Sequence, residues 1–315
     1  MPDSAVLTVA DPYEHQRLLR NANVRLIATT PGDYRAEVTR IDLDRLWMQR
    51  SHDHRPRLFH TAVGTSRAIT FFLTDEQQAP LFHSGRELLS DQIMLYAPGA
   101  EHYQRSTSVC RWGSLSLPPD DLAAAGMAIA GHELRPPAVT QCLRPPPHLL
   151  SRLRQLHATA GNLAATVPDI IAQPAVARAI EQELILALVR CLTECEAPAD
   201  PAPGHKRLPV MRRFEEILKA ADGRPLHLPE VCAAIGVSER TLRLHCLEHL
   251  GLSPHRYLLL RRMNQARRAL AAADPTATTV TAVATEFGFW ELGRFSVAYR
   301  NLFGEPPSVT LQRTA

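Results

Sequence analysis

Two arginines, Arg240 and Arg243, stand three residues apart in a stretch that opens with Ser238. Residues with this spacing face the same way on a helix, so both guanidinium groups would share one surface. A guanidinium can donate two hydrogen bonds to O6 and N7 of guanine, or it can bind a phosphate without reading sequence. The Ser238 hydroxyl is suited to cap the start of such a helix. These residue types therefore indicate contact with DNA, in either of the two ways.

A helix that presents these arginines needs a partner helix to pack against, and the sequence supplies one directly upstream. Apolar residues recur there at helical spacing: Leu226, Leu228, Val231 and Ile235. Gly236 then breaks the pattern before Ser238. Two short helices joined by a turn that contains glycine form a helix-turn-helix, whose second helix can enter a DNA major groove. We expect this motif over about residues 226–249.

The same arrangement occurs again over about residues 277–302. An apolar period that starts at Val280 ends at Phe287, Gly288 interrupts it, and aromatic residues resume it from Phe295. The repetition predicts a second helix-turn-helix in the same domain.

The segment between the two motifs has the pattern of one long helix. It starts with Ser253, a residue type that caps helices, and with Pro254, which helices accept at their first position. A helix of about 20 residues spans roughly 30 Å, close to the roughly 34 Å of one DNA turn. A rod of that length would place two recognition helices in successive major grooves on one face of the DNA.

About residues 208–311 resemble the DNA-binding domain of the AraC/XylS family of bacterial transcription regulators. The motifs that carry the resemblance are Arg262-Met263 and Ala266-Arg267 in the long helix, the Gly288-Phe289 turn, Phe295, Tyr299 and the closing Gly304-Glu305-Pro306-Pro307. Several motifs in the family's order are much more specific than one short pattern. The resemblance implies a sequence-specific regulator, more often an activator, that binds promoter DNA and contacts RNA polymerase.

The resemblance places the base-facing positions of the second recognition helix at Leu292, Gly293, Arg294 and Val297. Only Arg294 can make a strong polar contact, so this helix is expected to read DNA shape and thymine methyl groups. Glu291 could accept a hydrogen bond from cytosine N4 or cap the helix N-terminus, and capping is the expectation.

The first recognition helix departs from the family, in which an arginine usually stands at the position of Leu244 and a phenylalanine at that of Cys246. It is therefore expected to read fewer bases, and His245 is either a further contact or a packing residue. The candidate DNA-binding residues are Ser238, Arg240, Thr241, Arg243, Glu291, Gly293, Arg294 and Arg300.

The charge distribution agrees with a DNA-binding segment. Residues 205–315 contain 16 Lys and Arg against 10 Asp and Glu, whereas the preceding residues contain 19 against 22. The formal net charge of the whole chain is only +3, so the basic character is concentrated in its last third. A basic segment that coincides with two helix-turn-helix motifs is the electrostatic footprint of a phosphate-binding surface.

The sequence has no feature typical of a membrane or secreted protein. Its N-terminus lacks a basic stretch followed by an apolar run, and no stretch approaches the roughly 18 consecutive apolar residues of a membrane span. We therefore expect a cytoplasmic protein. The 6 cysteines include no CxxC pair, which argues against a zinc ribbon or a disulfide framework. Cys191 and Cys195 lie four residues apart and so on one face of the predicted helix. They could form a thiol-based sensor or be two buried reduced cysteines.

Residues 24–117 alternate apolar and polar residues in short runs separated by turn formers, which predicts the strands of a sandwich or barrel. Residues 91–102, with a Pro-Gly turn and His102, look like the second half of a cupin barrel motif. The region is similar to the sensor domain of AraC-type regulators, which implies an unidentified small-molecule effector. The aromatic residues that could line its cavity or simply form core are Trp47, Phe59, Phe71, Tyr96 and Trp112.

Histidines in the same region could form a metal site, since cupin enzymes use an HxH pair and a later histidine. The candidates are His52, His54, His60, His83 and His102. No glutamate follows His54 at the expected few residues, and Arg50, Arg55 and Arg57 would repel a cation. We therefore expect no bound metal and no cofactor, with these histidines at the surface or hydrogen-bonded in the core.

Residues 146–196 are expected to be helical, with apolar residues at every fourth position: Val176, Ile180, Leu184, Leu188 and Leu192. Such a stripe either packs on the barrel or pairs with another subunit. By family resemblance this segment mediates dimerisation, so we expect a homodimer. A proline-rich linker at 197–207 then separates the sensor, residues 1–145, from the DNA-binding residues 208–315.

The expected fold class is α+β, with an N-terminal cupin-like barrel or sandwich, a helical dimerisation segment and an all-α DNA-binding domain. The expected function is that of an effector-responsive transcription activator, and not of an enzyme. Two alternatives are a metal-dependent cupin enzyme tethered to DNA and a DNA-binding protein without an effector. No nucleophile–base pair, glycine-rich phosphate loop or paired-carboxylate motif stands out, so no catalytic residue is expected.

Overall fold

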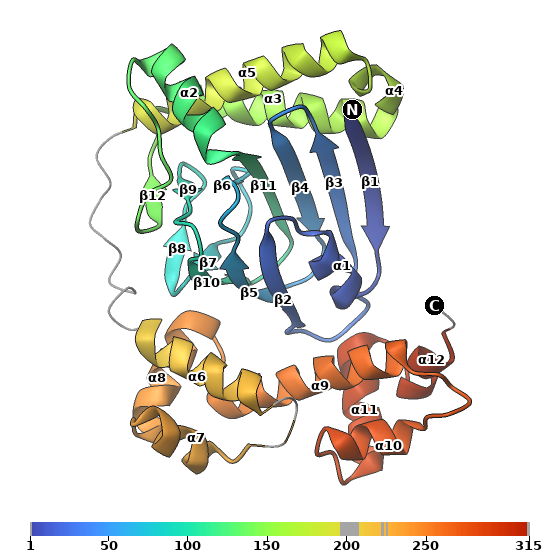
Figure 1. The fold of residues 1–315 in the computed structure, drawn as a ribbon. Helices are drawn as coiled ribbons and strands as arrows, with labels where there is room; N and C mark the ends of the chain where they lie inside the picture. Colours follow the sequence, from blue (N-terminus) through green and yellow to red (C-terminus); the bar gives the residue numbers. More distant parts are fainter. Residues whose placement is uncertain (1, 196–207, 222–223, 225, 314–315) are drawn as a thin grey trace.

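The computed structural model describes residues 2–195, 208–221, 224 and 226–313. A β-sandwich carries a layer of helices on each of its two sides (Figure 1). The α+β class expected from the sequence is confirmed. The proline-rich linker predicted at residues 197–207 lies outside the described residues.

Antiparallel strands of the described residues form two sheets. The order of the first sheet is β1 (Asp3–Val9), β3 (Ala36–Asp42), β4 (Trp47–Asp53), β11 (Cys110–Leu117), β6 (Ala68–Leu73), β9 (Ile93–Leu95) and β12 (Gln141–Leu143). The order of the second sheet is β2 (Ala22–Ala28), β5 (Arg57–Val63), β10 (Glu101–Ser106), β7 (Leu81–His83) and β8 (Arg86–Leu88). Side chains of both sheets meet in one buried cluster, which makes the pair a sandwich.

The second sheet has apolar residues on both of its faces. Leu26 and Phe59 belong to the cluster inside the sandwich, whereas their neighbours Ile27 and Leu58 pack with the C-terminal helices. Tyr103 of β10 joins the same outer face. Successive side chains of a strand point to opposite faces, so a strand buried on both sides carries apolar residues at consecutive positions. The C-terminal helices therefore cover this sheet.

The first sheet is covered by α3 (Pro147–Thr166) and α5 (Pro174–Thr193), together with α2 (Pro119–Ala130) and α4 (Pro168–Ile171) (Figure 1). The apolar stripe of α5 is buried within the chain, where Leu184, Leu188 and Leu192 share a cluster with Phe72 and Leu115 of the sheet. Of the two uses that the sequence allows for this stripe, packing on the sandwich is the one the structure shows. Among the described helices, none has both the length and the apolar character needed to cross a bilayer.

Two helices lie within the expected sensor, residues 1–145, one on each side of the stretch 24–117 predicted to form strands. The first is α1 (Pro12–Leu18), which begins where the Asp11 carboxylate accepts a hydrogen bond from the backbone N–H of Tyr13 at 2.7 Å. The second is α2, which follows β11 directly and has Pro119 as its first residue. Both starts follow the ordinary rules for helix N-termini, so the local sequence is sufficient to explain them.

The C-terminal helices are α6 (Leu208–Ala220), α7 (Leu228–Ile235), α8 (Glu239–Leu250), α9 (Pro254–Ala272), α10 (Val280–Glu286), α11 (Leu292–Phe303) and α12 (Pro307–Gln312). The pairs α7–α8 and α10–α11 are the two predicted helix-turn-helix motifs. Their turns contain Gly236 and Gly288 with φ of 79° and 73°, a backbone conformation that favours glycine. The predicted start of α9 is confirmed, since Ser253 caps it and Pro254 is its first residue.

Candidate nucleic-acid interface

The first recognition helix, α8, has an exposed side and a buried side. Ser238 occupies its N-cap position, and the Oγ atom accepts a hydrogen bond from the backbone N–H of Thr241 at 3.1 Å. Leu242 is fully buried, whereas Arg240 and Arg243 are exposed. The predicted cap is confirmed, and the spacing of the arginines puts both guanidinium groups on the exposed side.

The second recognition helix, α11, starts differently. Glu291 occupies its N-cap position but makes no side-chain capping hydrogen bond. Its carboxylate lies 2.9 Å from Arg294, and both side chains are largely exposed. The prediction that Glu291 caps the helix is therefore wrong. Short side chains reach the first-turn N–H groups best, and the longer glutamate reaches the guanidinium instead. An exposed pair of this kind contributes at most about 1 kcal/mol, so Arg294 is free to change partner.

Apolar side chains are exposed around these polar residues on both recognition helices. Leu244, Trp290 and Val297 are 56%, 74% and 62% exposed. Leu247 and Leu292 are exposed as well. Trp290 therefore does not cover the turn of the second motif. Side chains of this kind are able to contact thymine methyl groups in a major groove.

The long helix α9 joins the two motifs. Its buried apolar residues recur at helical spacing: Tyr257, Leu260, Met263, Ala266 and Leu270. It contacts α8 in the first motif and α10 in the second (Figure 1). Its 19 residues span about 29 Å at 1.5 Å per residue. The helix is thus long enough to hold two recognition helices roughly one DNA turn apart.

Seven of the eight predicted DNA-binding residues fall into two groups. In the first two turns of α8 and at its cap are Ser238, Arg240, Thr241 and Arg243, and at the start of α11 are Glu291, Gly293 and Arg294. Arg300 is exposed, but it lies in the last turn of α11 and is separate from both groups. Its charge there complements the negative end of the helix dipole.

A buried ionic cluster around Glu215 of α6 joins the C-terminal helices to the sandwich. The Glu215 carboxylate lies 2.6 Å from Nη1 of Arg25 on β2 and 3.0 Å from Nη1 of Arg261 on α9. Tyr257 donates a hydrogen bond to the same carboxylate, and Nδ1 of His60 on β5 lies 3.7 Å away. Burial opposes ionisation of Glu215, but His60, Arg25 and Arg261 lower its pKa to about 2. We refer to these five residues as the Glu215 cluster.

Apolar contacts surround the Glu215 cluster. Ile27, Leu58 and Tyr103 of the second sheet belong to the same buried core as the apolar residues of α6, α8 and α9. Near α1, Nε of Arg267 on α9 lies 2.6 Å from the Asp11 carboxylate. The sandwich and the C-terminal helices therefore share a continuous packed interface that extends along α9.

The interior of the sandwich is packed with the aromatic residues that the sequence singles out. Phe59, Phe71, Tyr96 and Trp112 are each at most 5% exposed and belong to one buried cluster. They are core residues, which is one of the two interpretations, cavity lining or core, that the sequence left open. Trp47 lies apart from them, half-buried, with the guanidinium of Arg67 3.9 Å from its ring centroid.

A fully buried ion pair lies among these aromatic residues. The Asp53 carboxylate accepts hydrogen bonds from Nε of Arg57 at 2.9 Å and from Nε1 of Trp112 at 3.1 Å. Ser51 donates to the same carboxylate at 2.6 Å. The Arg57 guanidinium lies 3.8 Å from the centroid of the Phe59 ring. Buried charges of this kind persist in proteins when they are paired and hydrogen-bonded.

The histidines considered as a cupin metal site do not converge. They lie in separate places: His52 is beside His54 with their rings tilted, His60 is in the Glu215 cluster, and His83 is stacked on His102. Within the described part of the chain, the side chains with metal-ligand spacing are His245, Glu248 and His249 of α8. The sequence signal for this group is H-x-x-E-H, which a search for HxH pairs misses.

Cys191 on α5 and Cys195 just after it are both reduced thiols. Burial raises the pKa of Cys191 to about 12 and also raises that of Cys195. A thiol that stays protonated is a poor nucleophile and a poor target for oxidation. The structure therefore favours two unreactive thiols over a redox sensor, with Cys191 buried and Cys195 half-buried.

Known proteins match the C-terminal part of the chain. Residues 231–313 match the model of a family described as a helix-turn-helix domain. The probable thc operon regulatory protein of Rhodococcus erythropolis is 37% identical over 115 residues, which cover 36% of this chain and 33% of that protein. The XylDLEGF operon transcriptional activator 2 of Pseudomonas putida is 31% identical over 103 residues, which cover 33% of this chain and 66% of that protein.

A solved structure of a probable AraC family transcriptional regulator from Rhodopseudomonas palustris is 36% identical. It aligns with 33% of this chain and 95% of its own, with a TM-score of 0.29. The chain thus spans about a third of the thc operon regulator and less than two thirds of the XylDLEGF activator. The helix-turn-helix region of this chain is therefore that of the AraC/XylS family of transcription regulators.

Proposed function

We propose that the protein is a sequence-specific DNA-binding regulator that activates transcription in response to a small-molecule effector. The observation that carries the proposal is the pair of recognition helices, which expose Arg240, Arg243 and Arg294 on a frame set by α9. The length of α9, about 29 Å, is close to the roughly 34 Å of one DNA turn. Each protomer would therefore contact a promoter in two successive major grooves.

The two helices would read DNA in different ways. Arg240 and Arg243 offer paired donors to guanine, or to phosphate, from α8. On α11, Arg294 supplies the polar contact, while Leu292 and Val297 are exposed and suited to thymine methyl groups. On binding, Arg294 exchanges its contact with Glu291 for a contact with DNA. That exchange costs little, because an exposed ion pair is weak.

We propose the sandwich, within residues 1–145, as the effector-binding part. Its second sheet is the face that contacts α6, α8 and α9, so a ligand that favours one position of this sheet would favour one placement of the recognition helices. By analogy with the family, the protein would act in the cytoplasm, as a homodimer and in contact with RNA polymerase. Since the α5 stripe is buried, the dimer would use the other side of this helix, where Leu186 is 40% exposed.

The proposal is tested by mapping the DNA that the protein binds in its source organism and measuring affinity for one mapped fragment. We expect a shared motif with two half-elements about one helical turn apart. Arg240→Ala should weaken binding to that fragment by roughly 5- to 150-fold, the equivalent of about 1–3 kcal/mol, and affect random DNA much less. Arg212→Ala is the matched control, because Arg212 is an exposed arginine of α6 and so is not part of either recognition helix.

Two results would contradict parts of the proposal. Equal losses on mapped and random DNA would reduce Arg240 to a phosphate contact. Diffuse binding that disappears at modest salt concentration would mean that the basic surface binds DNA without sequence preference. The function would then have to lie in the sandwich.

A further inference from the structure

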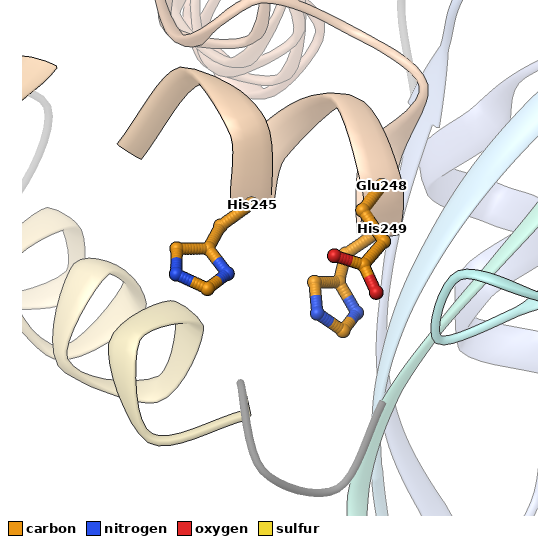
Figure 2. Close-up of side chains that lie close together, drawn as sticks. All are labelled: His245, Glu248 and His249. Atoms are coloured by element: carbon orange, nitrogen blue, oxygen red, sulfur yellow. The ribbon is translucent and has the colours of Figure 1, made fainter. Parts of the chain in front are cut away.

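Three side chains that are able to bind a metal project from the same side of α8 (Figure 2). They are His245, Glu248 and His249, and their ligand atoms all lie within 4.8 Å of one another. Residues three and four apart are neighbours on a helix surface, which explains why they converge. The rings of His245 and His249 are nearly parallel, with centroids 6.5 Å apart.

The donor set suits a transition metal. Two imidazoles and one carboxylate are ligands of Zn²⁺ at distances of about 2.0–2.2 Å, and three protein ligands leave a fourth position for water. Donors at that distance from a tetrahedral ion lie roughly 3.3 Å apart. The side chains therefore need to draw together by about 1.5 Å at most, which rotation about their own bonds provides.

The surroundings place this group at the boundary between the recognition helix and the sandwich. His249 is only 1% exposed, and its ring centroid lies 6.4 Å from that of Tyr103 on β10. Glu248 packs on the turn between β7 and β8, where a Cβ on Gly85 would come within 2.9 Å of its Cγ. His245 and Glu248 are half-buried, so an ion has access from one side. Arg105 lies nearby, where a Cβ on Gly251 would come within 2.5 Å of its Nε atom.

We propose that His245, Glu248 and His249 form a binding site for a divalent first-row transition metal, with Zn²⁺ as the representative ion. Bound metal clamps the last two turns of α8 from the side that contacts the sandwich. This position is opposite the exposed arginines, so the ion adds rigidity to the recognition helix without occupying its exposed surface. The binding step is independent of the proposed regulatory function, because it needs only these three side chains.

The test uses the full chain, stripped of metal with a chelator and titrated with Zn²⁺ against a chromophoric zinc indicator. We expect a single equivalent to bind, and Co²⁺ to give the visible absorption typical of a tetrahedral site. His245→Gln and Glu248→Gln each remove a direct ligand. Each should therefore weaken binding by more than the roughly 10-fold that loss of an outer-shell partner costs.

The matched control is the double substitution His52→Gln, His54→Gln, which removes another pair of adjacent histidine rings, 4.0 Å apart, at the end of β4. This control should leave the zinc affinity unchanged. His245 and Glu248 are chosen because they are only half-buried, and circular dichroism reports whether each variant is folded. As an independent readout, Zn²⁺ should raise the melting temperature of the wild type and the control but not of Glu248→Gln.

Three outcomes would overturn the proposal. They are absence of stoichiometric zinc binding by the wild-type chain, full zinc affinity in both His245→Gln and Glu248→Gln, and loss of affinity only in the His52/His54 control. Failure of the protein to bind DNA would not affect these measurements, so the two proposals are tested separately.

Discussion

At the scale of single residues, His157 of α3 is held neutral by its surroundings. The side chain is 1% exposed, and its Nε2 atom lies 3.1 Å from the backbone carbonyl of Gln49, to which it donates. Its ring packs edge-on against Phe72, with centroids 5.1 Å apart. Burial lowers the pKa of His157 from 6.5 to about 4. Between these values the unfolded chain binds a proton that the folded protein does not.

The free energy of unfolding should therefore fall as the pH is lowered from 6.5 towards 4. The full difference in pKa corresponds to roughly 3 kcal/mol. His157→Gln keeps an N–H donor but does not titrate, so we expect it to lose less stability than the wild type between about pH 7 and pH 5 in urea unfolding. His132→Gln is the control, because His132 is exposed. Identical pH profiles of wild type and His157→Gln would contradict the assignment.

Residue types alone are enough to predict some roles and not others. Ser238 caps α8 as expected, because a short hydroxyl side chain has few other partners within reach. Glu291 occupies the same position in α11, yet it pairs with Arg294. Its choice depends on the conformation of two exposed side chains, which the sequence pattern does not record. The H-x-x-E-H spacing on α8 is also visible in the sequence. Whether these side chains suit a metal depends on the surroundings of the helix, which the spacing does not give.

At the scale of elements, α11 contains a glycine where helix geometry does not require one. Gly293 is the second helical residue, and a Cβ there would meet nothing within 4 Å. Glycine in a helix is less favourable than alanine by roughly 0.5–1 kcal/mol. Gly293→Ala should therefore raise the free energy of unfolding by up to about 1 kcal/mol. If the backbone of α11 approaches DNA closely, the added methyl group should at the same time weaken binding to the mapped site.

Denaturant unfolding and DNA titration measure the two effects separately. Gly236→Ala is the matched control, since its Cβ would also meet nothing within 4 Å but its φ is 79°. That substitution should destabilise the protein by about 1 kcal/mol, because an L side chain is strained in this conformation. A more stable Gly293→Ala variant with unchanged DNA affinity would remove Gly293 from the candidate contacts.

The long elements are the ones that the sequence predicts well. Periodic apolar residues and helix caps are local signals, and they suffice for α7 to α11 and for strands such as β5 and β6. Strands of three residues such as β7, β8 and β12 are too short to show a period, and the pairing that defines them involves distant residues. The packed interior of the sandwich was one of two outcomes left open by its aromatic residues, since core and pocket use the same residue types.

At the scale of the whole molecule, the Glu215 cluster is a buried ionic contact within the interface that joins the two parts of the chain. Glu215→Gln would leave Arg25 and Arg261 without their shared carboxylate in a buried place, which should cost about 3 kcal/mol or more. We expect thermal unfolding to separate into two steps as the interface weakens. Glu216→Gln is the control, since Glu216 is 62% exposed and 3.7 Å from Arg212. It should change stability by no more than about 0.5 kcal/mol. A single unchanged transition in Glu215→Gln would contradict this role.

The same cluster gives a pH dependence of known sign. The pKa of Glu215 is lowered from 4.5 to about 2, so its contribution is present above pH 4.5 and is lost as the pH falls towards 2. The wild type should therefore lose stability in this range, whereas Glu215→Gln should lose less.

The contact between the two parts is the feature that the sequence predicts least. Arg25 and Glu215 are far apart in the chain, and each alone has the pattern of an ordinary surface charge. Strand residues such as Ile27 and Leu58 indicate that both faces of a sheet are apolar, but they do not indicate which elements cover the outer face. The fold class follows from local periodicity, and the way the parts join follows from tertiary packing.

The position of α8 between the sandwich and its exposed arginines has a mechanical consequence. A helix with its side chains is roughly 10–12 Å across, so Arg240 and Arg243 lie on the far side of a single helix from Tyr103 and Gly85, about two turns nearer to its N-terminus. A helix moves as a rigid body. If the strands shift the end of α8 that they contact, the guanidinium groups of Arg240 and Arg243 would move by a distance similar to that shift. Paired hydrogen bonds to a base tolerate little misalignment. A movement of α8 by about the length of one hydrogen bond would therefore be enough to permit or prevent base recognition.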